Sequence, residues 1–209
     1  MFFAGQNLYV DCAIMKYQTP NSQNEVLPNL PGLTTLEEIS LSEFEGFLQA
    51  EIILTEELTA KTKFNLKYIL NIHKLALGHL YSFAGKYRDV NLSKGGFPFA
   101  AARFLPETMN TFQSEILSKL PGIYNSIDLL ISDVANVHAE LLFIHPFREG
   151  NGRTARVLAN LMVRKQGFSP LKFEKVGKDE FELYIAAVQK AAGKDYKLME
   201  EFVRLIFPG

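Results

Sequence analysis

The chain has 209 residues, 47% of them apolar and 22% charged, and its 22 basic against 23 acidic residues give a net charge of −1. This length suits one domain with an arm, and the near-neutral charge argues against nucleic acid or an anionic membrane as a partner. The single cysteine, Cys12, excludes an internal disulfide and a cysteine-based zinc site. No apolar run approaches the ~20 residues that span a bilayer, and no basic region precedes the opening apolar residues. The sequence therefore predicts a cytoplasmic protein.

Turn-forming residues mark the first part of the chain. Residues 18–34 contain three prolines and three asparagines, which favour turns and loops. We therefore predict an N-terminal arm over residues 1–34 and a helical body over residues 35–209. Thr35 followed by Glu38 has the spacing of a capping box, which predicts that a helix carrying Ile39, Phe44 and Phe47 begins there.

The central part of the chain alternates helical and extended patterns. Apolar residues recur every three or four positions over residues 62–83, which predicts an amphipathic helix. Residues 85–99 alternate around Gly95-Gly96, a hairpin signal, and Pro98 confines the second strand to an edge. Helical spacing returns from Pro106 to about residue 120.

Four further helices complete the predicted fold. They are expected over residues 126–143, 152–166, 179–192 and 196–207. The second of them has a buried stripe of Val157, Leu158, Leu161 and Met162, and Gly167 is suited to end it in a left-handed conformation. The sequence thus predicts a mainly α protein with one small hairpin.

The segment that carries chemistry is His145-Pro146-Phe147-Arg148-Glu149-Gly150-Asn151-Gly152-Arg153-Thr154-Ala155-Arg156. The two glycines allow close backbone approach to a ligand, and the helix that begins near Gly152 presents unpaired amides and partial positive charge to an anion. Arg153 and Arg156 are suited to grip phosphates. Glu149 would repel phosphate unless Mg²⁺ lay between them, and His145 is the side chain suited to take a hydroxyl proton.

Residues 145–156 resemble the signature of Fic-domain proteins, histidine–x–phenylalanine–x–acid–glycine–asparagine–glycine–arginine–x–x–arginine, and every fixed position is met. The resemblance extends from about Glu45 to Phe207, with residues 84–88 and the hairpin Lys94-Gly95-Gly96-Phe97 similar to the family's strand flap. It implies a mainly α Fic-type helical bundle over residues 35–209, with a small β-hairpin flap over the active site.

What the resemblance implies is transfer of AMP from ATP to a Ser, Thr or Tyr hydroxyl of a target protein. His145 would be the general base, and Glu149 would hold Mg²⁺ on the phosphates. The phosphates would be bound by a set of signature residues: Gly150, Asn151, Gly152, Arg153, Thr154 and Arg156.

The resemblance also implies roles for the flap and for one later helix. Lys94, Gly95 and Phe97 would lie over the nucleotide, and Tyr184 would wall the adenine pocket. A target segment would pair with the exposed edge of the flap by strand addition.

Several alternatives stay open at this point. The same fold can transfer UMP, GMP or phosphocholine, because the signature fixes the diphosphate and says little about the base. A metal-dependent hydrolase using His138, His145 and Glu149, or a catalytically inactive binding module, would belong to different classes. Gly152, where some relatives have lysine, favours adenylyl transfer over phosphorylation.

Regulation is a separate expectation. Many relatives carry an inhibitory string of serine or threonine, three residues, glutamate, then glycine or asparagine. Thr111 to Glu115 has the spacing but is followed by Ile116, and Leu41 replaces the hydroxyl residue before Glu45-Gly46. We therefore expect a separate antitoxin-like inhibitory protein, or self-association as a homodimer.

Overall fold

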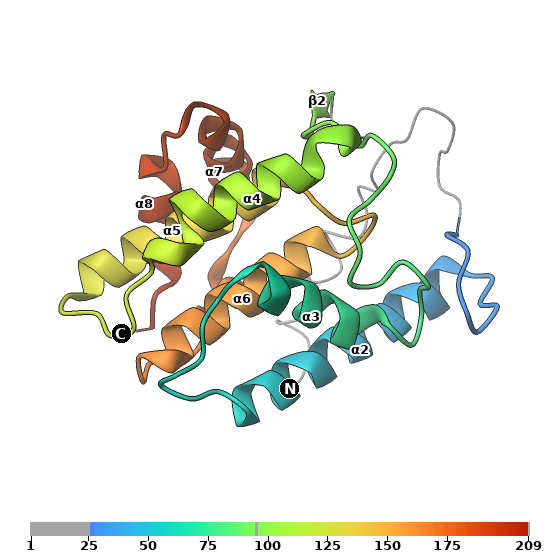
Figure 1. The fold of residues 1–209 in the computed structure, drawn as a ribbon, viewed down its shortest axis with the longest axis horizontal. Coiled ribbons are helices and arrows are strands. Elements are labelled where there is room, and N and C mark those ends of the chain that lie inside the picture. Colours follow the sequence, from blue (N-terminus) through green and yellow to red (C-terminus); the bar gives the residue numbers. More distant parts are fainter. Residues whose placement is uncertain (1–25, 95, 209) are drawn as a thin grey trace.

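The computed structural model describes residues 26–94 and 96–208. In chain order, the elements are α2 (Leu36–Glu56), α3 (Leu66–Leu77), β1 (Ser93–Lys94), β2 (Phe97–Pro98), α4 (Leu105–Glu115), α5 (Ile127–Ile144), α6 (Asn151–Lys165), α7 (Lys178–Lys190) and α8 (Lys197–Ile206). The strands form one antiparallel hairpin (Figure 1). The predicted mainly α fold with a small hairpin is confirmed.

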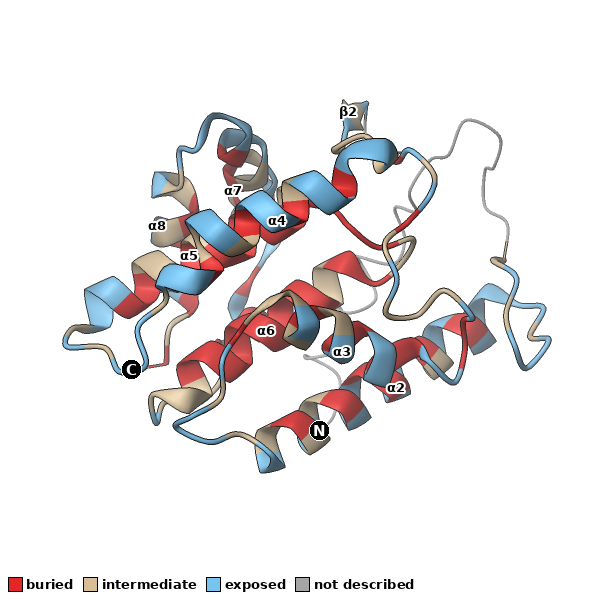
Figure 2. Cartoon of the chain, viewed as in Figure 1, coloured by how far each residue is buried: buried red, intermediate tan, exposed pale blue. Residues whose placement is uncertain are grey.

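Helix α6 lies at the centre of the bundle. It packs against α5 on one side and against α2 and α3 on another, while α7 and α8 pack on α5 (Figure 1). Every residue from Thr154 to Val163 is buried, so α6 has almost no solvent face (Figure 2). The predicted stripe on this helix is confirmed. Because α6 follows the signature loop directly, the most enclosed helix of the fold positions the candidate site.

The helix starts follow local capping chemistry. The Thr35 side chain accepts from the amide of Glu38, whose own side chain returns to the amide of Thr35, so the predicted capping box starts α2. Ser126 caps α5 by accepting from the amide of Asp128. On α2, Ile39 and Phe47 are buried, whereas Phe44 is 40% exposed.

Two predicted helices were too long. Helix α3 begins only after Asn65, which caps it, and ends at Leu77, whose carbonyl accepts from the amides of both Leu80 and Tyr81. Leu80 and Tyr81 are buried in the core although they lie outside the helix, so they extended the apolar pattern without extending the helix. Helix α4 likewise ends at Glu115 and is followed by a short 3-10 turn, Leu117–Lys119.

The described part of the predicted arm packs against the body. The amide of Leu30 donates to the carbonyl of Leu80 at 2.9 Å, and the Asn29 side chain bonds the backbone of Leu33 in both directions. Residues 1–25 lie outside the described residues, so the boundary of the arm at residue 34 stays a prediction. Among the described helices, none is long and apolar enough to cross a bilayer.

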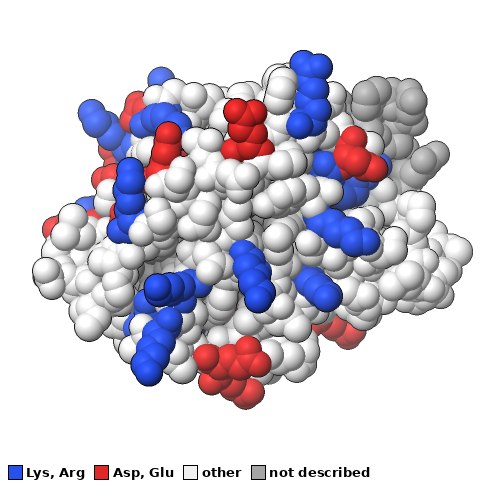
Figure 3. Space-filling model, in the orientation of Figure 1, with Lys and Arg blue, Asp and Glu red and all other residues white. Residues whose placement is uncertain are grey.

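Charge is distributed rather than gathered on the face shown in Figure 3. Lys and Arg side chains are scattered there among Asp, Glu and uncharged atoms. This distribution agrees with the balanced composition, because a basic field of the kind that attracts nucleic acid would need clustered positive side chains.

Candidate active site

The signature loop is held by its own side chains and by two residues from other segments, His73 and Arg88. His145 ends α5 in a left-handed conformation with φ 55°, and Gly150 precedes α6 with φ 74°. Between them, the Asn151 side chain accepts from the amide of Phe147 and donates to its carbonyl, both at 2.8 Å. The buried side-chain amide of Asn151 therefore closes the loop through the backbone of Phe147.

The tautomer of His145 follows from its neighbour. Nδ1 lies 2.8 Å from the carbonyl of Leu142, which only accepts, so Nδ1 carries the proton and Nε2 keeps a lone pair. The ring is 4% exposed and stacks on Phe99 with centroids 3.8 Å apart. Burial lowers the pKa of His145 to about 3, and the charges of Lys94 and Arg88 act in the same direction. The imidazole is thus neutral at physiological pH, with Nε2 in the accepting form.

Glu149 occupies the turn before α6. Its Oε1 accepts from the amide of Gly150 at 2.8 Å and lies 3.5 Å from Arg153 Nη2. Its carbonyl accepts from His73 Nε2 at 3.0 Å, because His73 Nδ1 already accepts from the amide of Gly85. Burial raises the pKa of Glu149, and the nearby carboxylate of Glu43 adds to the shift. A cation beside this carboxylate would stabilise its charged form.

The two signature arginines contact different neighbours. Arg153 Nη2 lies 2.6 Å from Glu43 Oε2, and its guanidinium lies 4.9 Å from the centroid of the Phe47 ring. Arg156 is 3% exposed and lies over the ring of Phe173, 5.5 Å from its centroid. The first arginine is therefore held from α2, and the second from the loop before α7.

The two glycines of the loop differ in their surroundings. A Cβ at Gly150 would lie 2.9 Å from Leu77 and 3.0 Å from Phe47, in addition to the strain of its positive φ. A Cβ at Gly152 would meet nothing within 4 Å, and Gly152 lines the cavity described below. Only Gly150 needs glycine for the fold, whereas the space at Gly152 is open to a ligand. Thr154 is fully buried, and its amide donates to the carbonyl of Gly150.

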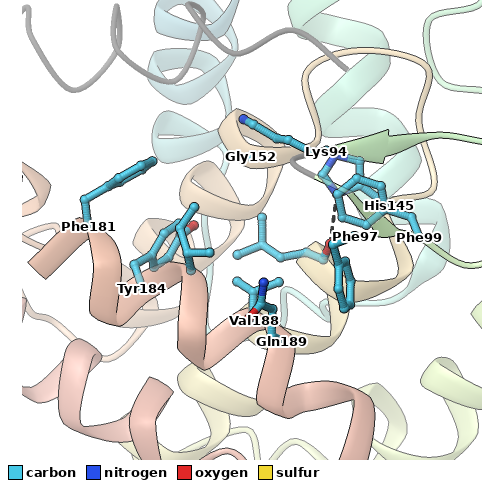
Figure 4. Close-up of a pocket in the computed structure, with 11 residues that line it drawn as sticks. Lys94, Phe97, Phe99, His145, Gly152, Phe181, Tyr184, Val188 and Gln189 are labelled. Atoms are coloured by element: carbon cyan, nitrogen blue, oxygen red, sulfur yellow. Dashed lines mark hydrogen bonds between the residues drawn. The ribbon is translucent and has the colours of Figure 1, made fainter. Parts of the chain in front are cut away.

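A cavity that opens to solvent lies between the hairpin, the signature loop and α7 (Figure 4). It is lined by Lys94, Phe97, Phe99, Leu142, His145, Gly152, Phe181, Tyr184, Ile185, Val188 and Gln189. The walls from α7 and the hairpin are mostly apolar, and Lys94 extends from the hairpin toward Gly152 (Figure 4). The predicted flap residues Lys94 and Phe97 therefore face this cavity together with Tyr184. Gly95 lies outside the described residues.

The hydroxyl of Tyr184 is oriented by His138. Nδ1 of His138 lies 3.1 Å from the carbonyl of Ala155, so it carries the proton, and Nε2 accepts from the Tyr184 hydroxyl at 2.9 Å. Both ring nitrogens of His138 are thus used inside the protein and do not point at a metal with His145. Among the described residues, no group of three or more His, Cys, Asp or Glu side chains could hold a metal ion. These observations weigh against the metal-dependent hydrolase.

Sequence reasoning missed Arg88 and the apolar face of α7. Arg88 is 4% exposed and donates to the carbonyls of His145 at 2.7 Å, of Val90 at 2.6 Å and of Ala100, while its amide donates to Pro146. It thus joins the base of the hairpin to the signature loop. On α7, Phe181, Ile185 and Val188 recur at helical spacing beside Tyr184, a signal that was present in the sequence.

Comparisons of the sequence with known proteins match the chain to one family. A model of the Fic/DOC family matches residues 63–163. Protein adenylyltransferase Fic from Nematostella vectensis is 33% identical over 146 residues, which are 68% of this chain and 32% of that protein. The protein of the same name from Aedes aegypti is 32% identical over 121 residues, 57% of this chain and 23% of that protein. The chain therefore spans about a third or less of the length of these relatives.

Solved structures show the same fold. BepC from Bartonella tribocorum with bound AMPPNP superposes with a TM-score of 0.72 at 18% identity, covering 91% of this chain and 96% of that chain. The N-terminal Fic domain of Bep8 from Bartonella sp. 1-1C also has a TM-score of 0.72, at 20% identity, covering 91% of this chain and 94% of that chain. The fold thus extends well beyond the matched residues on both sides. With its complete signature, the chain belongs to the Fic/DOC family.

Proposed function

We propose that this chain transfers AMP from ATP to a hydroxyl side chain of a target protein. The relatives named protein adenylyltransferase and the structural neighbour with AMPPNP support the proposal. The observation that carries it is the state of His145 in this molecule. Its Nδ1 is committed to Leu142, its ring is neutral, and it lines the cavity beside Gly152 and Lys94. A proton acceptor thus borders an open, glycine-lined surface suited to phosphate.

In the proposed reaction, the target oxygen attacks the α-phosphorus of ATP. The new bond is between this oxygen and phosphorus, the bond between the α-phosphorus and the bridging oxygen breaks, and pyrophosphate leaves. The hydroxyl proton goes to Nε2 of His145, which Leu142 keeps in the accepting tautomer. Arg153 and Arg156, in the first two turns of α6, supply positive charge for the leaving phosphates together with the N-terminal amides of the helix.

The residues present fit Mg²⁺ brought by the nucleotide rather than a resident ion. Mg²⁺ typically takes one or two protein carboxylates and completes its shell with water and phosphate oxygens. Glu149, whose side chain accepts from the amide of Gly150 at the phosphate-binding loop, offers one such carboxylate. We propose that Glu149 holds the ion, which when bound would neutralise phosphate charge.

The cavity also bears on the transferred group. The walls supplied by Phe97, Phe181, Tyr184 and Val188 suit a flat nucleobase. The polar groups at the cavity are few, so the base is selected mainly by shape. We therefore propose ATP as the donor, with UTP and GTP as the competitors to test.

The hairpin is suited to hold an extended target segment. Its register pairs Ser93 with Pro98 and Lys94 with Phe97, and the amide of Phe99 donates to Leu92. Since antiparallel pairs alternate between bonded and non-bonded positions, Ser93 directs its amide and carbonyl away from β2. Pro98, which has no amide proton, takes the non-bonded position. We propose that a target strand pairs with β1 at Ser93.

We also propose that inhibition comes from a separate antitoxin-like protein. Glu115, which ends the incomplete string in α4, lies 3.6 Å from Lys194 with its side chain 55% exposed, and Glu45 is exposed on α2. If either glutamate inhibited the chain from within, Glu115→Gln or Glu45→Gln would raise automodification. We expect no gain from either variant.

Labelled donors test the proposed function. Added to a lysate with Mg²⁺, the wild-type chain should increase the label on protein from ATP labelled at the α-phosphate, and should add none from ATP labelled at the γ-phosphate beyond that of the lysate alone. His145→Ala should lower this transfer by about 10²–10⁴-fold, the usual contribution of a general base, while His79→Ala, at an exposed histidine, should not. Label that the chain adds from the γ-phosphate, or only from UTP, GTP or CDP-choline, would overturn the proposal.

A further inference from the structure

Glu43 contributes to the site from α2, outside the residues that the family model matches. Its side chain is only 7% exposed. Oε1 accepts from the hydroxyl of Tyr81 at 2.7 Å, and Oε2 lies 2.6 Å from Nη2 of Arg153. A buried carboxylate is tolerated only with such partners, so this arrangement is strongly held.

The close packing of α2 sets this contact. A Cβ at Gly46 would lie 2.0 Å from the carbonyl oxygen of Ala76, so glycine is required for α2 to lie so near α3. One turn from Glu43, Phe47 lies against Gly150 and beneath the Arg153 guanidinium. The face of α2 that carries Glu43 and Phe47 therefore fixes the position of Arg153.

Two carboxylates share this one guanidinium. Nη2 of Arg153 lies 2.6 Å from Glu43 but 3.5 Å from Oε1 of Glu149. Without the charge of Glu43, Glu149 would be the remaining carboxylate beside Arg153. We expect the guanidinium to close to the ~2.8 Å of a direct charge-assisted hydrogen bond. Glu149 would then be neutralised by Arg153 and would attract a cation less.

We propose that Glu43 is a positioning residue of the nucleotide site, which holds Arg153 on the α2 side and so keeps the carboxylate of Glu149 available to Mg²⁺. The proposal rests on the proposed function only in assigning Mg²⁺ and nucleotide phosphates to this loop. Together, Glu43, Glu149 and Arg153 carry one negative charge, which a divalent cation compensates and a phosphate alone does not.

The test measures ADP binding by calorimetry with Mg²⁺ and with EDTA, so no transfer is needed. In the wild type, Mg²⁺ should strengthen ADP binding. In Glu43→Gln, which keeps the shape of the side chain and an acceptor for Tyr81, this gain should fall about tenfold, as expected for one charge-assisted contact. Affinity in EDTA should be unchanged or tighter. Glu45→Gln, at an exposed position of the same helix, is the matched control and should keep the wild-type gain.

A second background separates positioning from a direct effect. In Arg153→Ala, adding Glu43→Gln should cause no further loss of the Mg²⁺ gain, because Glu43 acts through Arg153. An undiminished gain in Glu43→Gln would overturn the proposal, as would equal weakening with Mg²⁺ and with EDTA, which indicates a merely structural role. If Glu43→Gln fails to fold, Glu43→Asp and Tyr81→Phe must show smaller losses in the same direction, and a wild-type gain in both overturns it.

The outcome is distinguishable from failure of the proposed function. If the wild type transfers no label but Glu43→Gln loses the Mg²⁺ gain, positioning by Glu43 stands and adenylyl transfer fails. If the wild type transfers AMP but Glu43→Gln binds Mg²⁺ and ADP as the wild type does, adenylyl transfer stands and the positioning role fails.

Discussion

The signature loop and the hairpin meet at His145, yet they are held in place by different kinds of interaction. In the loop, buried side chains bond the backbone at successive positions: Asn151 bonds Phe147, His73 bonds Glu149, and Arg88 bonds His145. Phe147 is fully buried and stacks on His73, with centroids 3.9 Å apart. The loop conformation is thus fixed by the core of the protein.

The hairpin has much less support. Its strands are two residues long, Pro98 is exposed, and none of its residues in β1 and β2 is buried. Arg88 holds it at Val90 and Ala100, and Phe99 holds it by stacking on His145. A two-stranded hairpin is marginal by itself, so these few contacts determine its stability.

This difference matches what the proposed function would require of each part. Proton transfer and phosphate binding need groups held within a fraction of an ångström, which a buried loop provides. Exchange of target segments needs an element that opens at lower free energy than the whole protein. The site therefore combines a rigid wall with a weakly held cover, and the predictions below test that division.

The largest effect is expected where the loop packs most tightly. Gly150→Ala would place a methyl group 2.9 Å from Leu77 and 3.0 Å from Phe47 and would force alanine into a positive φ. Strain and overpacking together should lower the free energy of unfolding by about 2–4 kcal/mol in urea titrations.

Gly152→Ala is the matched control. The added methyl group meets nothing within 4 Å and lies in a helix, so the free energy of unfolding should be unchanged or rise by up to about 1 kcal/mol. Because the methyl group enters the space that we propose for phosphate, nucleotide affinity should still fall. Equal stability losses in the two variants would contradict the assignment of fold to one glycine and binding to the other.

The next effect is expected at the residue that joins the two regions. Arg88→Lys keeps a positive charge but cannot reach three carbonyls, so buried acceptors lose their partners and stability should fall by about 2–3 kcal/mol. Hydrogen exchange at the hairpin amides, that of Phe99 above all, should accelerate more than exchange in α6. Arg103→Lys, at an exposed arginine, should change neither, and equal acceleration in hairpin and core would argue against a local link.

Sequence reasoning succeeded where the determining residues are neighbours in the chain. The signature lies within twelve residues, and the capping box at Thr35 acts within three residues of the helix start. These features need no knowledge of the tertiary fold, because short-range geometry decides them.

It failed where distant residues decide the outcome. Glu43 and Arg153 are 110 positions apart, and nothing in the local sequence of either indicates the other. Arg88 looked like part of a loosely matched stretch, and only the folded chain shows its carbonyl partners. The end of α3 was misplaced because Leu80 is buried without being helical. Each case depends on which elements pack together, and periodicity cannot supply that information.

Three buried, neutral histidines at and around the signature loop predict that the free energy of unfolding falls in acid. Burial lowers the pKa of His73 to about 4 and those of His138 and His145 to about 3, from 6.5. Below pH 6.5 the unfolded chain binds protons that the folded chain does not, so stability present above pH 6.5 is lost as the pH falls toward 4. Each histidine adds a slope of up to about 1.4 kcal/mol per pH unit.

Urea titrations between pH 7 and 4.5 check this expectation. His138→Gln retains a donor for Ala155 and an acceptor for Tyr184. It should reduce the slope of the unfolding free energy against pH by the contribution of one histidine. Gly96→Ala, which changes only the hairpin and no titratable group, should keep the wild-type slope. A slope that His138→Gln leaves unchanged would show that this ring is not held neutral by the fold.

The smallest effect is expected within the hairpin itself. Gly96 has φ 80°, and a Cβ there would meet nothing within 4 Å, so Gly96→Ala adds backbone strain of about 1 kcal/mol and no clash. If the hairpin opens independently of the core, this strain should raise exchange of the Phe99 amide about fivefold while the global free energy of unfolding stays constant. A loss of about 1 kcal/mol in global stability would instead mean that hairpin and loop unfold as one unit. The contacts of Arg88 and Phe99 would then join the two regions more tightly than their number indicates.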